Sequence, residues 1–364
     1  MTLGTVHHRE ELTTTIRGAR AWRIRYSSQD SSGNVTESTG LVIAPSAGGA
    51  SLPVVTWGHG TTGLGDAACP SAQPDPAREL TVYFTAEATQ SIDYGVPGLQ
   101  AFIDEGWIVC ATDYAGLGTP GMHHYTVNTT NAIDMVGIVH AARTMDIGAG
   151  TQFGAMGWSQ GGGAAAAIAE LDADIYGELT LVGTVPISVG VGKIAMAHPV
   201  GAAQSLTATD VPPDPHLVML LVGTAAENPH LALSDVFTPL GVEIIEAAWN
   251  IQPVHHFNDT IGRLYRLKGA IMSIQPGVMP AWQAAIEAGS AAQRKPVCPI
   301  LVCMDTFDGG TVVPVVWQTD YVAAMQALGA QVSTKEYPHD DHFSLPTSCI
   351  ADATAWLKPF FTST

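Results

Sequence analysis

Positive charge is scarce in this 364-residue chain. It carries 15 lysines and arginines against 33 aspartates and glutamates, which gives a formal net charge of −18 at pH 7. A field of that sign repels nucleic acid and anionic membrane surfaces, so neither is expected as a partner, and it disfavours polyanionic substrates. Charged residues make up 13% of the chain and hydrophobic residues 46%. This composition predicts a globular protein with a sizeable core rather than a disordered one.

Long hydrophobic runs and paired cysteines are also missing. No stretch has the roughly 20 consecutive apolar residues that a membrane-spanning helix needs, so no stable membrane insertion is expected. The five cysteines show no C-x-x-C spacing, which argues against a zinc or thioredoxin-type site. Cys110 and Cys303 lie in apolar strand-like runs and are predicted to be buried thiols. A disulfide among Cys69, Cys298 and Cys349 is possible, but its pairing cannot be deduced from sequence.

Histidines occur in adjacent pairs, at His7-His8, His123-His124 and His255-His256. Neighbouring side chains on one chain diverge, so these pairs lack the spacing of a metal site. We assign no metal and no cofactor.

The most informative stretch runs from Gln152 to Ala169 and predicts a buried strand, a glycine-rich turn around Ser159, and an alanine-rich helix. A serine hydroxyl is a weak nucleophile and needs a tight turn that exposes it to a base. Gly157 and Gly161 suit such a turn because neighbouring backbone comes too close for a side chain. The G-x-S-x-G pattern alone is weak evidence in a chain with 38 glycines, but the strand before it and the helix after it support a nucleophile at Ser159.

Strands and helices alternate on both sides of this turn. The sequence predicts a hairpin of strands at the edge, buried strands that follow, and a helix over 78–89 among the intervening segments. This alternation indicates an α/β fold with a doubly wound, mostly parallel sheet. The rhythm breaks between 188 and 295, where several helices are predicted. We therefore expect a core formed by residues 1–187 and 296–364, with a helical cap inserted at 188–295 that covers the site; a purely structural excursion is the alternative.

A serine nucleophile needs a histidine as base and an acid that orients the histidine. Asp308 and His342 follow predicted strands and stand in the chain order serine, acid, histidine used by α/β-hydrolases. Because the carboxyl ends of parallel strands meet at one edge of the sheet, the three loops are expected to converge. His339 is the competitor of His342, and the position just before the last helix favours His342.

Several segments together resemble the bacterial branch of the secretory lipase family. They are Trp57 to Gly63, Cys69-Pro70-Ser71, Thr112 to Gly118, the turn around Ser159, Asp308 with Val313-Pro314, and Tyr337-Pro338 running to His342. The resemblance implies an α/β-hydrolase fold, a helical cap and hydrolysis of carboxylic esters. It also implies that Ser159 is the nucleophile, Asp308 the acid and His342 the base, and that the backbone N–H groups of Thr61 and Gln160 form the oxyanion hole.

The chain departs from the family pattern in two places. The acid usually stands two residues before the Val-Val-Pro segment, but Gly309, Gly310 and Thr311 intervene here, so Asp305 is an alternative acid. Gln160 stands where a glycine is usual. Its amide side chain is expected to narrow or polarise the floor of the pocket.

Four further residues are candidates for the wall of the substrate pocket: His59, Trp158, Asp113 and Tyr114. For His59, shaping the oxyanion loop through local hydrogen bonds is favoured over a role as base. For Asp113 and Tyr114, a structural role at the end of a strand is the favoured interpretation.

These features predict a serine esterase or lipase that acts on small, uncharged, hydrophobic esters. An acyltransferase, an amidase or peptidase, and a non-catalytic ligand-binding module with the same shell are the alternatives. The segment Met1 to Arg9 lacks the basic-then-apolar pattern of a secretory signal. We expect either a secreted protein whose leader is absent from this numbering, which is the favoured interpretation, or a cytoplasmic one. No feature of the sequence specifies an oligomeric state.

Overall fold

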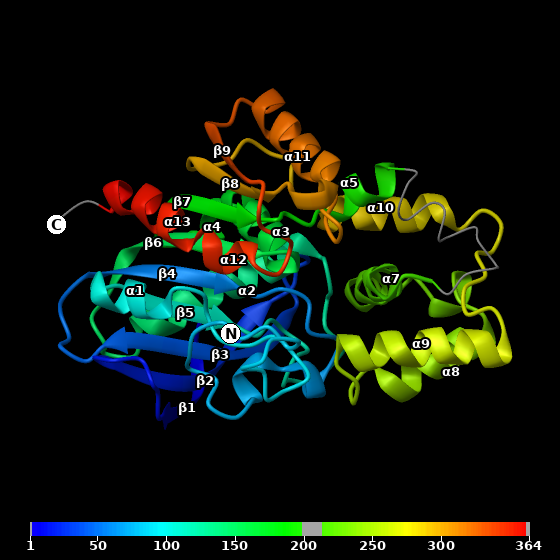
Figure 1. The fold of residues 1–364 in the computed structure, drawn as a ribbon, viewed down its shortest axis with the longest axis horizontal. Helices are drawn as coiled ribbons and strands as arrows, with labels where there is room; N and C mark the ends of the chain where they lie inside the picture. Colours follow the sequence, from blue (N-terminus) through cyan, green and yellow to red (C-terminus); the bar gives the residue numbers. More distant parts are fainter. Residues whose placement is uncertain (1, 199–212, 362–364) are drawn as a thin grey trace.

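The centre of the molecule is a nine-stranded sheet (Figure 1). The structure is a computed structural model that describes residues 2–198 and 213–361, and of Asp308 it describes the backbone only. The strand order is β1-β2-β3-β5-β4-β6-β7-β8-β9. The strands are β1 Val6–Leu12, β2 Ala19–Gln29, β3 Val35–Pro45, β4 Leu52–Gly58, β5 Ile108–Thr112, β6 Ala149–Trp158, β7 Thr180–Ile187, β8 Ile300–Asp305 and β9 Val332–Tyr337.

The sheet is mostly parallel, as the sequence predicts. The strands from β5 to β9 in this order pair in parallel, whereas β1, β2 and β3 pair antiparallel and β3 joins β5 antiparallel. The interior strand β5 is buried along its whole length, which explains why it lacks the alternation of a half-exposed strand. The parallel strands therefore place their carboxyl ends, and the loops that follow, at one edge.

Helices cover both faces of the sheet. One core cluster joins the sheet to α2, α3 and α11, and a second joins it to α1, α12 and α13. The helices of these layers are α1 Leu99–Asp104, α2 Asn128–Arg143, α3 Gln160–Ala167, α4 Ala173–Tyr176, α11 Val315–Ala327, α12 Leu345–Ser348 and α13 Ile350–Leu357. This arrangement confirms the doubly wound α/β architecture.

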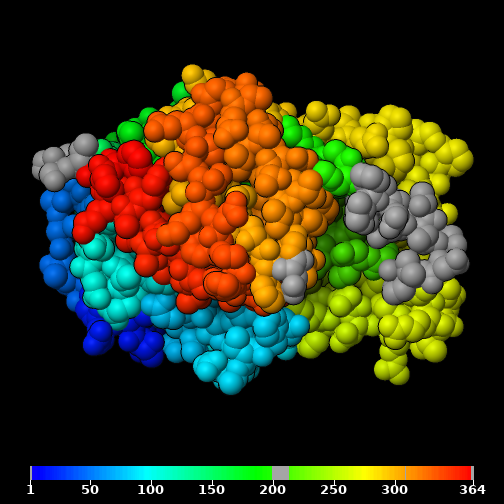
Figure 2. Space-filling view, turned by 45° about the horizontal axis from the view of Figure 1, so that its top comes forward, coloured from blue at the N-terminus to red at the C-terminus, as the bar shows by residue number. Residues whose placement is uncertain are grey.

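A group of helices lies beyond the carboxyl ends of the parallel strands and forms one end of the molecule, opposite the N-terminal strands (Figures 1 and 2). We call residues 215–289 the helical region. It has its own apolar cluster, which includes Phe257 and Trp282. Its helices are α7 Pro215–Glu227, α8 Pro239–Ala248, α9 Val254–Lys268 and α10 Met279–Gly289, and α5 Gly192–Ala197 precedes it. Residues 199–212 of the predicted cap lie outside the described part. No helix that the structure describes is long and apolar enough to cross a bilayer.

Two local predictions differ from the structure. The helix predicted over 78–89 is wrong, because Thr81 and Tyr94 exchange backbone hydrogen bonds of 2.9 and 3.2 Å; pairing with a distant segment outweighs local helix propensity there. Strand β1 has no counterpart in the sequence prediction. All five cysteines are buried, free thiols, which confirms the prediction for Cys110 and Cys303.

Candidate active site

Ser159 occupies the sharp turn between β6 and α3. Its backbone has φ 60° and ψ −115°, a left-handed conformation that is strained for a serine and persists only when neighbours hold it. Its N–H donates to the carbonyl of Ile187 at 2.9 Å, and its carbonyl accepts from the N–H groups of Gly163 at 3.1 Å and Gly190 at 3.2 Å. The turn is therefore fixed to the end of β7 and to the first turn of α3.

The glycines around Ser159 are required by backbone packing. A β-carbon at Gly161 would overlap the carbonyl group of Gly58, and one at Gly157 would overlap the carbonyl of Gly161. The end of β4, the end of β6 and the first turn of α3 thus touch through backbone atoms alone. Since the first N–H groups of a helix have no acceptor within it, the N–H of Gln160 is placed beside Ser159 without a helical partner.

His342 lies in the loop between β9 and α12 and is only 2% exposed. Its carbonyl accepts a hydrogen bond of 2.8 Å from Nε1 of Trp158, and the two rings are tilted with centroids 5.2 Å apart. Ser159 and His342 line the same cavity of about 80 Å³. Among the described residues no hydrogen bond joins them, and in free enzymes such contacts often tighten only when substrate binds. Burial lowers the pKa of His342 to about 3, with a further lowering by His216, so the ring is neutral.

Nδ1 of His342 lies 2.9 Å from Oγ of Ser188, the residue that follows β7. Ser188 is fully buried. The contact occupies one ring nitrogen, so Nε2 is the nitrogen left to accept a proton. Ser188 is not among the residues predicted from the sequence, although its place directly after a parallel strand is the same signal that points to Ser159.

The two candidate acids lie at the end of β8. Asp305 is fully buried, and its Oδ1 accepts a hydrogen bond of 2.8 Å from Nε2 of Gln318. Burial raises its pKa, while hydrogen bonds from Ser188 and Gln318 oppose that shift. Asp308 lies in the following turn, Phe307–Gly309, and its side chain is outside the described part of the chain. The structure thus places Asp305 within reach of Ser188, and through it near His342.

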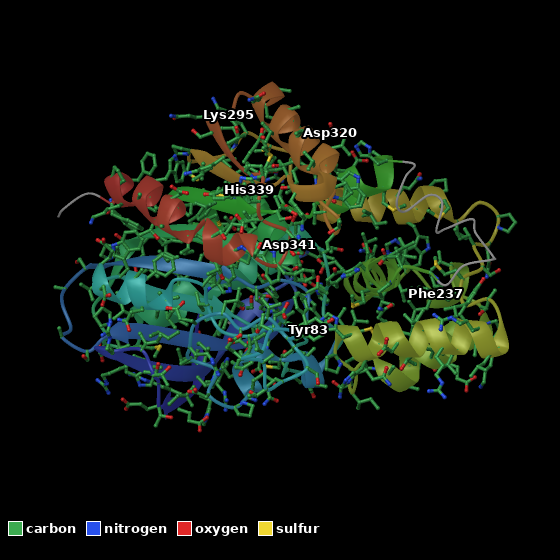
Figure 3. The ribbon with its side chains drawn as sticks, viewed as in Figure 1. Tyr83, Phe237, Lys295, Asp320, His339 and Asp341 are labelled. Atoms are coloured by element: carbon green, nitrogen blue, oxygen red, sulfur yellow. The ribbon has the colours of Figure 1, made fainter. Side chains whose placement is uncertain are left out.

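His339 and Asp341, in the loop between β9 and α12, are exposed and do not line the cavity at Ser159. His339 is exposed on the surface of the C-terminal segment, close to Asp341 (Figure 3). Asp341 accepts hydrogen bonds of 3.1 Å from the N–H of Phe343 and 2.9 Å from that of Ser344, which fixes the start of α12. Of the two histidines, only His342 lines a cavity with Ser159.

The loop after β4, which begins at His59, packs against the turn around Ser159. The ring nitrogens of His59 are 2.6 Å from the carbonyl oxygen of Gly60 and 3.2 Å from that of Asp113, and burial lowers its pKa. Tyr114 is fully buried and donates to the carbonyl of His59 at 3.3 Å. A carboxyl oxygen of Asp113 accepts the N–H of Ser71 at 2.8 Å. These three candidates shape the loop and do not line the described cavities at Ser159.

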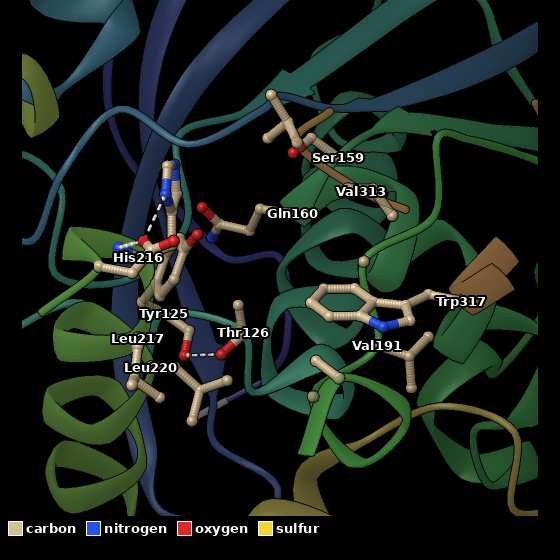
Figure 4. A pocket seen from close by; sticks show the side chains of 15 residues that line it. Tyr125, Thr126, Ser159, Gln160, Val191, His216, Leu217, Leu220, Val313 and Trp317 are labelled. Atoms are coloured by element: carbon tan, nitrogen blue, oxygen red, sulfur yellow. Dashed lines mark hydrogen bonds and ion pairs between the residues drawn. The ribbon is translucent and has the colours of Figure 1, made fainter. Parts of the chain in front are cut away.

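Gln160 is held by a second buried histidine. Nδ1 of His123 lies 3.0 Å from the carbonyl oxygen of Ala115, and Nε2 lies 2.6 Å from Nε2 of Gln160. Because burial lowers the pKa of His123 to about 3, the neutral ring donates from Nδ1 and accepts the Gln160 amide at Nε2. The amide also donates to Oδ1 of Asn131 at 3.3 Å. Gln160 therefore turns its N–H groups inward and lines a larger cavity of about 130 Å³ (Figure 4).

Within residues 2–198 and 213–361, no group of three or more histidine, cysteine, aspartate or glutamate side chains is arranged to hold a metal ion.

Comparison with known proteins gives one family match and several matches of overall fold. The model of the secretory lipase family matches residues 81–198. The rice cell wall degrading esterase LipA from Xanthomonas oryzae superposes with a TM-score of 0.72 at 20% identity, covering 99% of both chains. Candida antarctica lipase A in its closed state gives a TM-score of 0.69 at 13% identity, covering 99% of this chain and 82% of that one. No curated protein sequence matches the chain.

The two structural matches share the overall fold over 99% of this chain, and the family model covers the turn around Ser159. The resemblance to the secretory lipases is thereby confirmed, and the chain is a carboxylic ester hydrolase with an α/β-hydrolase fold.

Proposed function

We propose that the chain hydrolyses uncharged esters through a covalent acyl-enzyme, with Ser159 as nucleophile and His342 as base. The observation that carries this proposal is the meeting of a strained, backbone-clamped Ser159 and a buried neutral His342 in one cavity. A serine hydroxyl gains nucleophilicity only when a neighbouring base removes its proton. Nε2 of His342 is the base because Ser188 occupies Nδ1.

The steps follow from these positions. Oγ of Ser159 attacks the ester carbonyl while its proton passes to Nε2 of His342. The backbone N–H groups of Thr61 and Gln160 receive the developing negative charge; one such donor is typically worth about 100- to 1000-fold in rate. The C–O bond to the alcohol then breaks, and the proton on His342 passes to the leaving oxygen. Water releases the acyl group by the same route, so no cofactor is needed.

The imidazole also needs an acid that favours its Nδ1–H tautomer and its protonated form. We propose Asp308 as this acid because the resemblance to the secretory lipases implies it. We propose that the hydroxyl of Ser188 positions the ring through its contact with Nδ1. Asp305 is the alternative acid, supported by its proximity to Ser188. The helical region with its flanking segments, residues 188–295, is proposed as the cap, since residues of α7 line both cavities at Ser159.

The test is the Ser159→Ala variant with p-nitrophenyl acetate as substrate. We expect turnover to fall to the background rate with an unchanged circular dichroism spectrum. The control Ser46→Ala, at an exposed serine that lines neither cavity at Ser159, is expected to keep full activity. A fluorophosphonate probe is expected to label Ser159 in the unmodified protein. Unchanged turnover in Ser159→Ala would exclude the proposed mechanism.

A further inference from the structure

The space around Ser159 is divided into two unequal lobes. Ser159 lines both the cavity of about 130 Å³ and the one of about 80 Å³. Gln160 lines only the larger cavity and His342 only the smaller. We call them the large lobe and the small lobe.

The position of His342 decides which part of an ester enters which lobe. If the proposed function holds, His342 must deliver its proton to the leaving alcohol oxygen when the tetrahedral intermediate collapses. The alcohol therefore has to lie on the imidazole side, in the small lobe. The acyl chain then points to the other side of Ser159, into the large lobe.

The large lobe is mostly apolar, although Asp214 and His216 also line it. Leu217 and Leu220 of α7 face Val191 and Trp317 across it (Figure 4). A cavity of about 150 Å³ takes a benzene molecule, so a volume of about 130 Å³ takes an acyl tail of roughly four to six carbons. This wall selects short, hydrophobic acyl groups.

The small lobe carries polar groups that the ester bond itself does not require. Asp93 is only 6% exposed and lines this lobe together with His255 and Thr61. One of its carboxyl oxygens, Oδ1, accepts the N–H of Tyr83 at 2.8 Å. The other oxygen has no hydrogen-bond partner among the described residues. A carboxyl oxygen that lines a substrate lobe and has no partner on the protein is open to a hydrogen bond from the ligand.

The environment of Asp93 keeps both of its protonation states within reach. Burial raises its pKa to about 7, against the lowering by the Tyr83 N–H. His255, half-buried and stacked on Tyr83, has a pKa lowered to about 4 by burial and by the neighbouring histidines His216 and His256, so it is neutral. Near pH 7 the carboxyl group can accept a hydrogen bond as carboxylate or donate one as acid, and a hydroxyl group can take either role.

We propose that the substrates are short-chain acyl esters of alcohols that carry further hydroxyl groups, and that Asp93 recognises one of those hydroxyls in the small lobe. Asp93 is a specificity residue of the leaving group and takes no part in the covalent steps. The proposal predicts that an ester of a polyol is hydrolysed faster than the ester of a plain alcohol with the same carbon skeleton.

The experiment compares glyceryl monobutyrate with propyl butyrate, which share the acyl group and the three-carbon alcohol chain. We expect kcat/KM to be at least about 10-fold higher for the glyceryl ester, because a hydrogen bond to a charged group is worth about 10-fold or more. Asp93→Leu is expected to remove that preference while changing kcat/KM for the propyl ester less than about twofold. Asp93→Asn, which can still accept the Tyr83 N–H and bond a hydroxyl, is expected to retain most of the preference.

Further measurements separate a failure of the proposed function from a failure of the lobe assignment. Turnover of p-nitrophenyl acetate reports on the nucleophile. If the unmodified protein does not hydrolyse this ester, the proposed function is contradicted, whereas the lobe assignment is not. An active enzyme with equal kcat/KM for the two butyrates overturns the role of Asp93, as does an equal loss on both in Asp93→Leu. If the leucine variant does not fold, the unmodified protein and Asp93→Asn decide. Trp317→Ala is expected to move the best p-nitrophenyl ester to a longer acyl chain, and an unchanged optimum overturns the acyl assignment.

Discussion

The edge of the sheet and the helical region hold the site in different ways. At the edge, the turns around Ser159 touch through glycine backbone, with no space for a β-carbon at Gly157 or Gly161. The helical region packs around an apolar cluster that also takes in Leu64 and Tyr125 of the sheet loops, and polar contacts add to this junction. Examples are the 2.8 Å hydrogen bond from the Val254 N–H to the Thr62 carbonyl and the 2.6 Å ion pair between Glu227 and His124.

This difference separates chemistry from selectivity. The groups that would make and break bonds lie on loops whose backbone positions are fixed by the sheet. His216, Leu217 and Leu220 of α7 and Trp317 of α11 form part of the wall of the large lobe. Substitutions at the edge should therefore affect catalysis for every substrate, whereas those in the helical region should change the range of substrates or the stability.

The largest effect that tests this division concerns the acid. Asp308→Asn is expected to lower kcat by about 1000-fold or more on every ester, because an amide no longer favours the Nδ1–H tautomer or stabilises the protonated His342. Asp305→Asn acts only through Ser188 and is expected to cost about 10-fold, the value of one hydrogen bond of this kind. Steady-state kinetics over an acyl-chain series measures both.

The reversed order of the two losses in kcat would point to Asp305 as the acid. If Asp305→Asn costs more than Asp308→Asn, and Ser188→Ala shows the same loss, the acid acts through a bridging hydroxyl. A shift in the acid limb of the kcat/KM pH profile then accompanies the loss, whereas a purely structural defect lowers the profile without moving it.

How far the site followed from the sequence depends on the type of signal. The G-x-S-x-G turn and the loop of His342 were predictable because each follows a parallel strand, and such strand ends share one edge. The choice between Asp305 and Asp308 depends on atomic positions in one turn, which spacing does not contain. Asp93 was missed because its burial comes from the distant pairing of Thr81 with Tyr94.

The fold followed from the sequence where apolar residues fill a strand or a helix face. Strand β1 escaped prediction because its sequence, Val-His-His-Arg-Glu-Glu-Leu, has a mostly exposed surface. It is held by pairing with β2, by the ion pairs Glu11–Arg20 and Glu10–Arg23, and by Arg9 over the ring of Trp22. Contacts of that kind exist only once β2 is in place.

A pair of glycine substitutions compares the two regions directly. Gly161→Ala forces a methyl group against the Gly58 carbonyl and is expected to lower the free energy of unfolding by about 3 kcal/mol or more. Gly262→Ala, in the middle of α9 and with only the end of the Arg266 side chain nearby at 3.8 Å, is expected to raise it by about 0.5 to 1 kcal/mol through helix propensity. Urea unfolding of both variants measures the difference.

The same pair also tests function. Gly161→Ala should lose activity on all esters, since it displaces the turn and the loop that follows β4, whereas Gly262→Ala should keep it. Equal stability changes of the same sign in the two variants would contradict the distinction between the backbone-packed turn at Gly161 and the open position of Gly262 in α9.

The smallest effect concerns the ion pair that joins the two regions. Burial lowers the pKa of His124, but the hydrogen bond and charge of Glu227 outweigh it, so the net shift is upward from 6.5. Burial raises the pKa of Glu227, but its hydrogen bonds to His124, Ser31 and Thr130 outweigh burial and bring the pKa below 4.5. The stabilisation from His124 is complete below about pH 6.5 and fades as pH rises through its raised pKa; that from Glu227 is complete above about pH 4.5 and fades as pH falls.

Glu227→Gln should therefore destabilise the protein most between about pH 4.5 and 6.5, by about 2 kcal/mol, and less at pH 9. The matched control is Glu178→Gln, which removes the exposed 2.9 Å ion pair with Arg143 and is expected to change the free energy of unfolding by less than about 1 kcal/mol. Urea unfolding across this pH range measures both variants. A pH-independent difference for Glu227→Gln would mean that its neutral hydrogen bonds to Ser31 and Thr130, rather than the charge pair with His124, attach α7 to the sheet.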